Sequence, residues 1–433
     1  MVMPVRFGTD GIRGRASDEI TVDLAYRLGR AVASVFSVPI YVGYDTRESS
    51  PALAAAVLAG LEAGGAVGVN LGYFTTPGVA VIAQQRGGAG VVVSASHNPY
   101  YDNGLKVLGV GGAKLDHATE AAVESALNVA ESPTTKEFDT VTIDEAAEHD
   151  YAKHLRALAP GDLSNLSIVV DCANGASSHV AHELFAATGA TLRTIHDQPD
   201  GRNINEASGS THVESLVAAV LESGADLGLA FDGDADRLIA VDNEGTVRDG
   251  DDLMVLFALD RQARGVLGGG VVVTSMSNLG LYRALEAAHI EIEETDVGDR
   301  NVLLALEEKE WLLGGEQSGH VIFRDLAPTG DGLLTGLLLG ELLVRRGPLA
   351  ELAGGAWRRV PQELFSVSLE HFSDSVVQGL FNELLEVYGV ERSDVRLLVR
   401  PSGTEPLVRI MIEALNAEFV EVFAERLKSL YGS

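Results

Sequence analysis

The pattern that most constrains this chain is a short apolar strand, followed by a small-residue turn and an amphipathic helix. It recurs in the segments 89–99 (AGVVVSASHNP), 166–178 (LSIVVDCANGASS) and 269–280 (GGVVVTSMSNLG). Strands linked through helices can run parallel, and the linking helices cover the faces of the sheet. The pattern therefore predicts three related α/β domains, with largely parallel sheets and helices on both faces.

Two further stretches refine this expectation. After the strand IYVGYD (40–45), Ser50 and Pro51 predict a helix N-cap followed by proline at the first helical position. Beyond about residue 360, the segments ELFSVSLE, VRLLVRPS and LVRIMIEA alternate with two helical stretches, which predicts a small α+β domain with an antiparallel sheet. The predicted domain limits are 1–155, 156–250, 251–360 and 361–433.

Length and charge narrow the class of protein. A chain of 433 residues is too long for one compact core and predicts two to four domains. Its 62 acidic and 32 basic residues give a net charge of −30, which argues against nucleic acid or an anionic membrane as partner. An acidic solubilising surface and adaptation to high salt both explain this charge. Basic residues are scarce, so those that cluster with glycine, serine and threonine are candidates for binding an anion.

The expected location is the cytoplasm. A single cysteine, Cys172, excludes an internal disulfide and a thiolate metal cluster. The start MVMPVRFGTD lacks the charged and apolar regions of a secretory signal. The most apolar window, GLLTGLLLGELLV, is interrupted by Glu341 and is too short to span a bilayer.

An acidic segment, FDGDADR, follows an apolar strand and places Asp232, Asp234 and Asp236 at every second position. In an extended segment this spacing puts the three carboxylates on one side, where they repel unless a cation lies between them. Oxygen-only ligands suit Mg²⁺. A solvated acidic turn is the alternative. An EF-hand loop fails because Arg237 and Asn243 occupy its glycine and glutamate positions. We predict a Mg²⁺ site that leaves positions for a phosphate oxygen.

A second cluster, RPSGTEPLVR, places Ser402, Gly403 and Thr404 between Arg400 and Arg409. Small residues let the backbone approach an anion, and arginine binds phosphate through two parallel hydrogen bonds. An ordinary hairpin turn with two exposed arginines is the alternative. The segment is not a P-loop, because the G-x-x-x-x-G-K-[ST] pattern is absent from it.

A third cluster, GGEQSGH, places Glu316, Ser318 and His320 at alternate positions between glycines. Side chains that share a face in this way can hydrogen-bond the hydroxyls of a polyol. A loop with a solvated glutamate and a structural histidine is the alternative.

The segment VSASHNP allows two interpretations of Ser96: a turn residue before proline, or a nucleophile at the end of a strand. His97 follows it directly, Lys106 lies ten residues further on, and Arg13 stands in the glycine-rich start FGTDGIRGR. Phosphoryl transfer to a hydroxyl needs a nucleophile, proton acceptors and cations that neutralise charge. A capping or packing role is the alternative for His97.

Five motifs follow one another along the chain: FGTDGIRG, SASHNP with YYDNGLK, DGDADR, GGEQSGH and RPSGTEP. Together these motifs resemble those of the α-D-phosphohexomutases, and the resemblance covers essentially the whole chain. Between them, VVDCANGA, DGRNIN, SMSNLGLY and VGDR resemble the bacterial phosphoglucosamine mutase branch. The resemblance implies three similar mixed-sheet α/β domains and a smaller C-terminal α+β domain around a central cleft. Ala235 replaces the middle glycine of the commoner DGDGDR form, and its small side chain is not a ligand.

The resemblance also implies roles for the matched residues. Ser96 is expected to be a phosphoserine, one of whose oxygens joins Asp232, Asp234 and Asp236 in holding a single Mg²⁺ ion. Which residue acts as general base stays open. The residues expected around the transferring group are Arg13, His97, Lys106 and Arg237. Those expected to bind substrate are Glu316, Ser318, His320, Arg400, Ser402, Gly403, Thr404 and Arg409.

The reaction implied is the interconversion of glucosamine 6-phosphate and glucosamine 1-phosphate, a step towards cell-wall amino sugars. It would pass through glucosamine 1,6-bisphosphate, which also serves as activator. The expected partner is a hexosamine monophosphate, with no nucleic acid or membrane, and the expected assembly is a monomer or homodimer. Two alternatives stay open: a mutase of mannose or glucose phosphates, and a non-catalytic sugar-phosphate binding protein, which would not need both Ser96 and the three aspartates.

Overall fold

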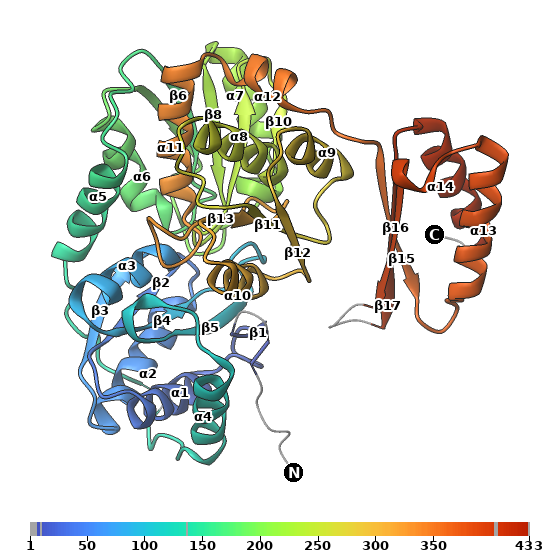
Figure 1. Cartoon of the computed structure of the whole chain (residues 1–433). Helices are drawn as coiled ribbons and strands as arrows, with labels where there is room; N and C mark the ends of the chain where they lie inside the picture. Colours follow the sequence, from blue (N-terminus) through green and yellow to red (C-terminus); the bar gives the residue numbers. More distant parts are fainter. Residues whose placement is uncertain (1–6, 9–10, 136, 402–405, 432–433) are drawn as a thin grey trace. The chain divides into compact units, whose positions relative to one another are not determined.

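The structure is a computed structural model that describes residues 7–8, 11–135, 137–401 and 406–431 (Figure 1). The chain forms two compact units, each described by itself below. The first contains the residues up to 275 together with 291–355, and the second contains 276–290 together with those from 356 onward. Within the described ranges, no helix is both long and apolar enough to cross a membrane.

The first unit begins with a five-stranded mixed sheet, ordered β1-β5-β4-β2-β3. Its elements are β1 (Ile12–Arg15), α1 (Val22–Val35), β2 (Ile40–Tyr44), α2 (Ser50–Ala63), β3 (Gly68–Tyr73), α3 (Thr76–Arg86), β4 (Ala89–Val93), β5 (Asp102–Leu108), η1 (Val110–Gly112), α4 (His117–Val129) and α5 (Ala146–Leu158). Strands β2, β3 and β4 run parallel, whereas β5 and β1 are antiparallel to their neighbours. Apolar residues of α1, α2 and α4 share one core with this sheet. Val79 of α3 packs against Gly43 and Gly90, so helices cover both faces.

Helix α2 begins one residue earlier than the sequence predicts. Its N-cap is Ser49 rather than Ser50, and Pro51 lies in the first turn. The hydroxyl of Ser50 instead donates to Asp45 Oδ1 at 2.8 Å. The same hydroxyl accepts from the side-chain amide of Asn103 at 2.9 Å, so both of these bonds tie Ser50 to its neighbours in the first domain.

The second domain repeats this sheet. Its elements are β6 (Ser167–Asp171), α6 (Ser177–Ala186), β7 (Thr191–Ile195), η2 (Gly209–Thr211), α7 (Glu214–Ser223), β8 (Leu227–Phe231), β9 (Leu238–Asp242) and β10 (Val247–Arg248). The order β10-β9-β8-β6-β7 matches that of the first sheet, with three parallel strands and an antiparallel pair at one edge.

The third domain keeps the same core with four strands, ordered β12-β11-β13-β14. Its elements are α8 (Gly250–Ala263), β11 (Val271–Thr274), β12 (Ile292–Thr295), α10 (Asp299–Lys309), β13 (Leu313–Gly315), β14 (Val321–Phe323), α11 (Gly332–Arg346) and α12 (Leu349–Ala356). Strands β11, β12 and β13 are parallel and β14 is antiparallel. The three similar α/β domains are confirmed. The sheets are mixed, as the family resemblance implies and unlike the largely parallel sheets that the strand–helix pattern alone predicts. Each contains two strands joined by a short loop, and such strands pair antiparallel.

The second unit is a small α+β structure, as predicted. Its elements are α9 (Leu279–Ala287), β15 (Gln362–Ser368), α13 (Asp374–Tyr388), η3 (Arg392–Asp394), β16 (Val395–Pro401), β17 (Leu407–Ala414) and α14 (Ala417–Tyr431). The sheet order is β15-β17-β16, with antiparallel pairing throughout. Helices α13 and α14 form one apolar core with the sheet. Asn278, at the start of α9, joins this unit because its amide donates to the carbonyl of Val360 at 3.0 Å.

Candidate active site

Three of the motifs occupy the same position in the three α/β domains. The serine loop (94–101) joins β4 to β5, the aspartate loop (232–237) joins β8 to β9, and the sugar loop (316–320) joins β13 to β14. Each loop follows the carboxyl end of a parallel strand, which is where open α/β sheets bind ligands. The loops also meet: Ser96 contacts Asp232, and His320 Nδ1 lies 3.7 Å from Asp236 Oδ2.

Ser96 is held in an unusual backbone conformation at the centre of this cluster. Its φ of +52° lies in the left-handed region, which costs an L-residue about 1 kcal/mol or more. The side chain is buried, and its hydroxyl donates to Asp232 Oδ2 at 2.5 Å. The same Oγ lies 3.3 Å from Nδ1 of His97, and the backbone N–H of Ser96 donates to Ser94 Oγ. The hydroxyl is therefore in contact with two groups that can accept its proton.

The three aspartates converge. One carboxylate oxygen from each of Asp232, Asp234 and Asp236 lies within 4.8 Å of the others, and all three side chains are buried. Burial, followed by the charges of Asp236 and Asp234, raises the pKa of Asp232 well above its usual range. Among the described residues, Oδ1 of Asp234 and Oδ1 of Asp236 have no hydrogen-bond partner. Unsatisfied buried carboxylate oxygens facing one another fit a divalent cation.

Several polar and cationic groups surround these carboxylates. Lys106 Nζ of β5 donates to Asp234 Oδ2 at 2.8 Å and lies 3.9 Å from Asp236 Oδ2. The hydroxyl of Thr76, at the start of α3, also donates to Asp234 Oδ2, at 2.6 Å. Arg237 lies with its Nε 3.8 Å from Asp236 Oδ1. Positive charge from the first two domains is therefore gathered around the aspartate loop.

Two histidines of the cluster differ in charge. Burial, then the positive charges of Arg237 and Arg13, lower the pKa of His97 to about 4, so its ring is neutral at neutral pH. Burial also disfavours the charged form of His320, but the nearby carboxylate of Asp236 outweighs it and raises the pKa of His320 to about 8. His320 Nδ1 lies 3.7 Å from Asp236 Oδ2. The predicted sugar-loop histidine therefore contacts the aspartate loop.

The remaining sugar-loop residues are partly engaged. Glu316 is largely buried, and its Oε1 accepts a hydrogen bond from the backbone N–H of Gly298 at 2.9 Å. The hydroxyl of Ser318 is a buried polar atom without a hydrogen-bond partner in the described part of the chain. Their binding of sugar hydroxyls stays a prediction.

The predicted phosphate-binding residues belong to the second unit. Arg400 of β16 and Arg409 of β17 stand opposite each other in the antiparallel register. Ser402, Gly403 and Thr404 lie outside the described residues. The role of this segment in holding phosphate stays a prediction.

Sequence reasoning missed a fully buried arginine, Arg47, beneath the serine loop. Its Nε donates to Asp45 Oδ2, and its Nη atoms donate to the carbonyls of Ser96, Asn98, Pro99 and Asp102. The segment TRESS, directly after the strand at 40–45, was a possible signal, because ligands bind at the carboxyl ends of strands in open α/β sheets.

A second missed residue, Asn205, belongs to the second domain. The side-chain amide of Asn205 donates to the carbonyls of Ser96 and Asn98 at 2.9 and 3.0 Å. Asn205 is the last residue of the DGRNIN segment quoted above, but it lies 109 positions from Ser96, so the segment gave no sign of this contact.

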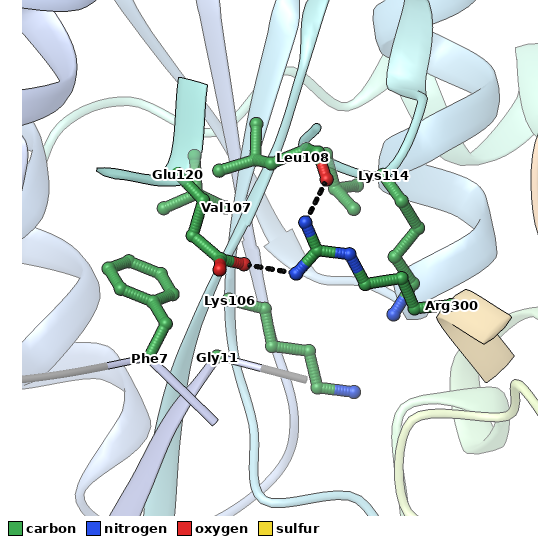
Figure 2. A pocket seen from close by; sticks show the side chains of 9 residues that line it. Phe7, Gly11, Lys106, Val107, Leu108, Lys114, Glu120 and Arg300 are labelled. Atoms are coloured by element: carbon green, nitrogen blue, oxygen red, sulfur yellow. Dashed lines mark hydrogen bonds and ion pairs between the residues drawn. The ribbon is translucent and has the colours of Figure 1, made fainter. Parts of the chain in front are cut away.

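The third domain also contacts the first beside Lys106. Figure 2 shows Arg300 of α10 reaching a small pocket that Lys106 helps to line. The guanidinium of Arg300 pairs with Glu120 of α4 at 2.7 Å and donates to the carbonyl of Leu115 at 3.0 Å. Lys114 pairs with Asp299 next to it at 2.5 Å. The VGDR segment thus joins the two domains that contribute the serine and sugar loops.

Four family profiles match nearly the whole chain. They describe phosphoglucomutase/phosphomannomutase alpha/beta/alpha domains I, II and III, at residues 4–134, 149–245 and 249–360, and the C-terminal domain, at residues 369–429. The exact domain limits given from the sequence, 1–155, 156–250, 251–360 and 361–433, stay a prediction.

Relatives and solved structures agree with these profiles. The chain is 43% identical to a phosphoglucosamine mutase of Macrococcus caseolyticus, covering 98% of both chains, and 44% identical to one of Rhodococcus opacus, covering 99% of both. Its fold is similar to that of a putative phosphomannomutase from Thermus thermophilus, with a TM-score of 0.80, 22% identity and full coverage of both chains. An Aspergillus fumigatus N-acetylphosphoglucosamine mutase, solved with GlcNAc-6P and magnesium, has a TM-score of 0.68 and 19% identity, covering 98% of this chain and 95% of that one.

Proposed function

Because the chain belongs to the phosphoglucomutase/phosphomannomutase family, the α-D-phosphohexomutases, we propose that it interconverts glucosamine 6-phosphate and glucosamine 1-phosphate. It is an isomerase that acts as an intramolecular phosphotransferase. The observation that carries the proposal is the contact of the Ser96 hydroxyl, at 2.5 Å, with one of three converging buried carboxylates. The choice of an amino sugar rests on the phosphoglucosamine mutases that share 43–44% of their residues with this chain.

The proposed reaction has two transfers. Phosphoserine 96 gives its phosphoryl group to the C1 hydroxyl of glucosamine 6-phosphate, which yields glucosamine 1,6-bisphosphate and a free serine hydroxyl. The bisphosphate reorients, and Ser96 Oγ takes the phosphoryl group from C6 while the C6 oxygen regains a proton. Glucosamine 1-phosphate leaves, and the phosphoserine is restored. The bisphosphate also primes a chain that lacks phosphate on Ser96.

The surrounding side chains suit these steps. Lys106 and Arg237 lie beside the aspartate loop, where they can neutralise a transferring phosphoryl group. Among the described residues, Asp232 and His97 contact the Ser96 hydroxyl and are in reach to accept its proton. We propose that Arg13 also faces the transferring group, that Glu316, Ser318 and His320 bind the sugar, and that Arg400, Ser402, Gly403, Thr404 and Arg409 hold the other phosphate.

The residues that would hold the metal are Asp232, Asp234 and Asp236, together with an oxygen of the phosphoserine. Mg²⁺ is the proposed ion, because these ligands are all oxygens. When bound, it would supply positive charge that offsets the charge of the phosphoryl group.

Product use and location complete the proposal. Glucosamine 1-phosphate would feed the synthesis of UDP-GlcNAc and of cell-wall precursors, and the enzyme would act in the cytoplasm. A monomer or a homodimer is the proposed assembly.

A substrate comparison tests the proposal. Turnover of glucosamine 6-phosphate, mannose 6-phosphate and glucose 6-phosphate is measured in one assay with Mg²⁺ and the matching 1,6-bisphosphates. We expect the highest kcat/KM for glucosamine 6-phosphate. A preference for either neutral sugar would contradict the proposed substrate but leave the mutase chemistry intact.

A mass measurement tests the phosphoserine. Intact protein is weighed before and after phosphatase treatment, and again after incubation with glucosamine 1,6-bisphosphate. We expect the mass of one phosphoryl group to be lost and regained, and peptide mapping to place it on Ser96. Phosphate on another residue would overturn the assignment of the nucleophile.

A further inference from the structure

The carbonyl oxygen of Ser96 accepts hydrogen bonds from two side chains in different domains. Arg47 Nη2, from the first domain, donates to it at 2.9 Å, and Asn205 Nδ2, from the second domain, donates at 2.9 Å. The same two nitrogens donate to the carbonyl of Asn98, at 2.8 and 3.0 Å. Two residues far apart in the chain therefore hold the same two carbonyls of the serine loop.

The orientation of the Asn205 amide follows from its partners. Both partners are carbonyl oxygens, which only accept, so the nitrogen rather than the oxygen of the amide must face them. The two N–H groups of the amide are used up by these two bonds.

Asn205 is itself held in place. Its φ is +58°, a left-handed conformation that asparagine tolerates better than most residues, and its side chain is only 7% exposed. Its backbone N–H donates to the carbonyl of Ala173 at 2.9 Å, in the loop that follows β6. The side-chain amide of Asn205, which donates to the first domain, is thus held by a hydrogen bond within the second domain.

The aspartate loop lies directly against this contact. A Cβ atom on Gly233 would stand 2.6 Å from the carbonyl oxygen of Ser96 and 3.1 Å from Asn205 Nδ2. Only glycine lets the aspartate loop approach so closely. The position of the Ser96 carbonyl therefore sets the distance between the nucleophile and the carboxylates.

We infer that Asn205 is a positioning residue for phosphoryl transfer, which holds the serine loop of the first domain against the aspartate loop of the second. This inference rests on the proposed function. The left-handed conformation of Ser96 persists only where its surroundings impose it, and Arg47 and Asn205 supply the bonds that do so. Arg47 acts within its own domain, whereas Asn205 links the nucleophile to the domain that carries the aspartates.

The test is Asn205→Asp, which keeps the size and the left-handed tolerance of the side chain but turns a donor into an acceptor facing two carbonyls. The matched control is Asn174→Asp. Asn174 is also 7% exposed and left-handed, with a φ of +48°, but its side chain bonds Asn203 and Gln198 instead of the serine loop.

Two readouts are compared in both variants and the wild type. For Asn205→Asp we expect kcat to fall about 10- to 100-fold, because a small misplacement of reacting groups is costly, while KM changes less than about twofold. We also expect faster hydrogen exchange in the peptide covering 94–103. For Asn174→Asp we expect neither effect.

Each outcome decides the inference. If Asn205→Asp lowers kcat no more than the control does, or leaves exchange of the serine loop unchanged, Asn205 does not position the nucleophile. If Asn205→Asp fails to fold, Asn205→Gly takes its place, because glycine accepts the left-handed backbone and removes the same two bonds. Failure of the proposed function is distinguishable, since wild-type protein would then not turn over glucosamine 6-phosphate, whereas hydrogen exchange needs no substrate.

Discussion

The serine loop and the aspartate loop occupy the same position in two copies of one sheet, but they are supported differently. Each contains a non-glycine residue in the left-handed region, Ser96 with φ +52° and Ala235 with φ +58°. The carbonyl of Ser96 accepts from two side chains, Arg47 and Asn205. The carbonyl of Ala235 accepts instead from a backbone N–H, that of Gly332 at 3.0 Å.

The support of the aspartate loop is therefore the start of a helix. Gly332 is the first residue of α11, and the N-cap Asp331 accepts hydrogen bonds from Leu334 N at 3.0 Å and from the Tyr151 hydroxyl at 2.8 Å. A helix start offers fixed backbone donors, which suits a loop that must hold still around a charge. The serine loop, which carries the proposed nucleophile, depends on side chains for its support, so we expect single substitutions to loosen it.

The largest expected effect is a loss of turnover on substitution of Ser96, which tests the chemistry of the serine loop without changing its support. Ser96→Ala removes the phosphate acceptor but none of the bonds to the backbone carbonyl, so we expect turnover to fall by at least about 10³-fold. The unfolding temperature and the hydrogen exchange of the loop should stay as in the wild type. Coupled assay, calorimetry and exchange mass spectrometry measure these quantities. Turnover close to that of the wild type would exclude Ser96 as nucleophile.

The next effect concerns the aspartate loop. Asp232→Asn replaces a carboxyl whose charged form is disfavoured by burial and by the charge of Asp236, the causes that raise its pKa. We expect the metal-free variant to unfold at or above the wild-type temperature, while Mg²⁺ no longer raises that temperature. Turnover should fall by at least about 10²-fold, in line with loss of a metal ligand. Thermal scans with and without EDTA measure this, and an unchanged Mg²⁺ shift would contradict the metal site.

A smaller effect tests the helix that supports the aspartate loop. Burial raises the pKa of Asp331 to about 6 from 3.8, so its native carboxyl protonates more readily than in the unfolded chain. The protonated carboxyl of Asp331 therefore favours the folded state. This contribution to stability is fully present below pH 3.8 and is lost as the pH rises through about 6. Asp331→Asn keeps a helix cap without the charge. As the pH rises across this window, the wild type loses stability and the variant does not. We therefore expect the free energy of unfolding of Asp331→Asn to rise relative to that of the wild type by on the order of 2 kcal/mol.

Urea titrations from pH 4 to pH 7 measure that difference. Asp116→Asn is the matched control, because Asp116 is also an N-cap but its hydrogen bonds with Thr119 lower its pKa. The control should show no such gain, because a pKa below 3.8 places its change in stability below this pH window, so its difference from the wild type stays nearly flat from pH 4 to pH 7. If the difference in unfolding free energy between Asp331→Asn and the wild type did not change with pH, the pKa of Asp331 would not be raised.

The smallest effect concerns the left-handed residue of the aspartate loop. Glycine accepts the φ of Ala235 without strain, but it also gives the unfolded chain more freedom, so Ala235→Gly should stabilise by at most about 1 kcal/mol. Turnover should stay within about twofold, since the carbonyl bond to Gly332 is kept. A large loss of activity would mean that the methyl group has a role in the site. Calorimetry and the coupled assay decide this.

Much of the fold was predictable because its signals are local. The apolar strands and amphipathic helices of the three α/β domains follow from periodicity, and the spacing of Asp232, Asp234 and Asp236 already placed their carboxylates on one side. Strand direction was not predictable in the same way. The β4–β5 pair is antiparallel, although the pattern favoured parallel sheets, because periodicity describes the faces of a strand and not its neighbour.

By itself, the sequence determined the fold class and the family and named the residues that we propose to carry the chemistry, because each of these rests on short contiguous motifs. Only the tertiary structure decided which residues support those motifs. Asn205 and Arg47 converge on the carbonyl of Ser96 from two different domains, and Gly332 supports Ala235 from the start of a distant helix. The reason is physical: a hydrogen bond depends on where two atoms lie in space, and chain separation carries no record of that distance until the domains have packed.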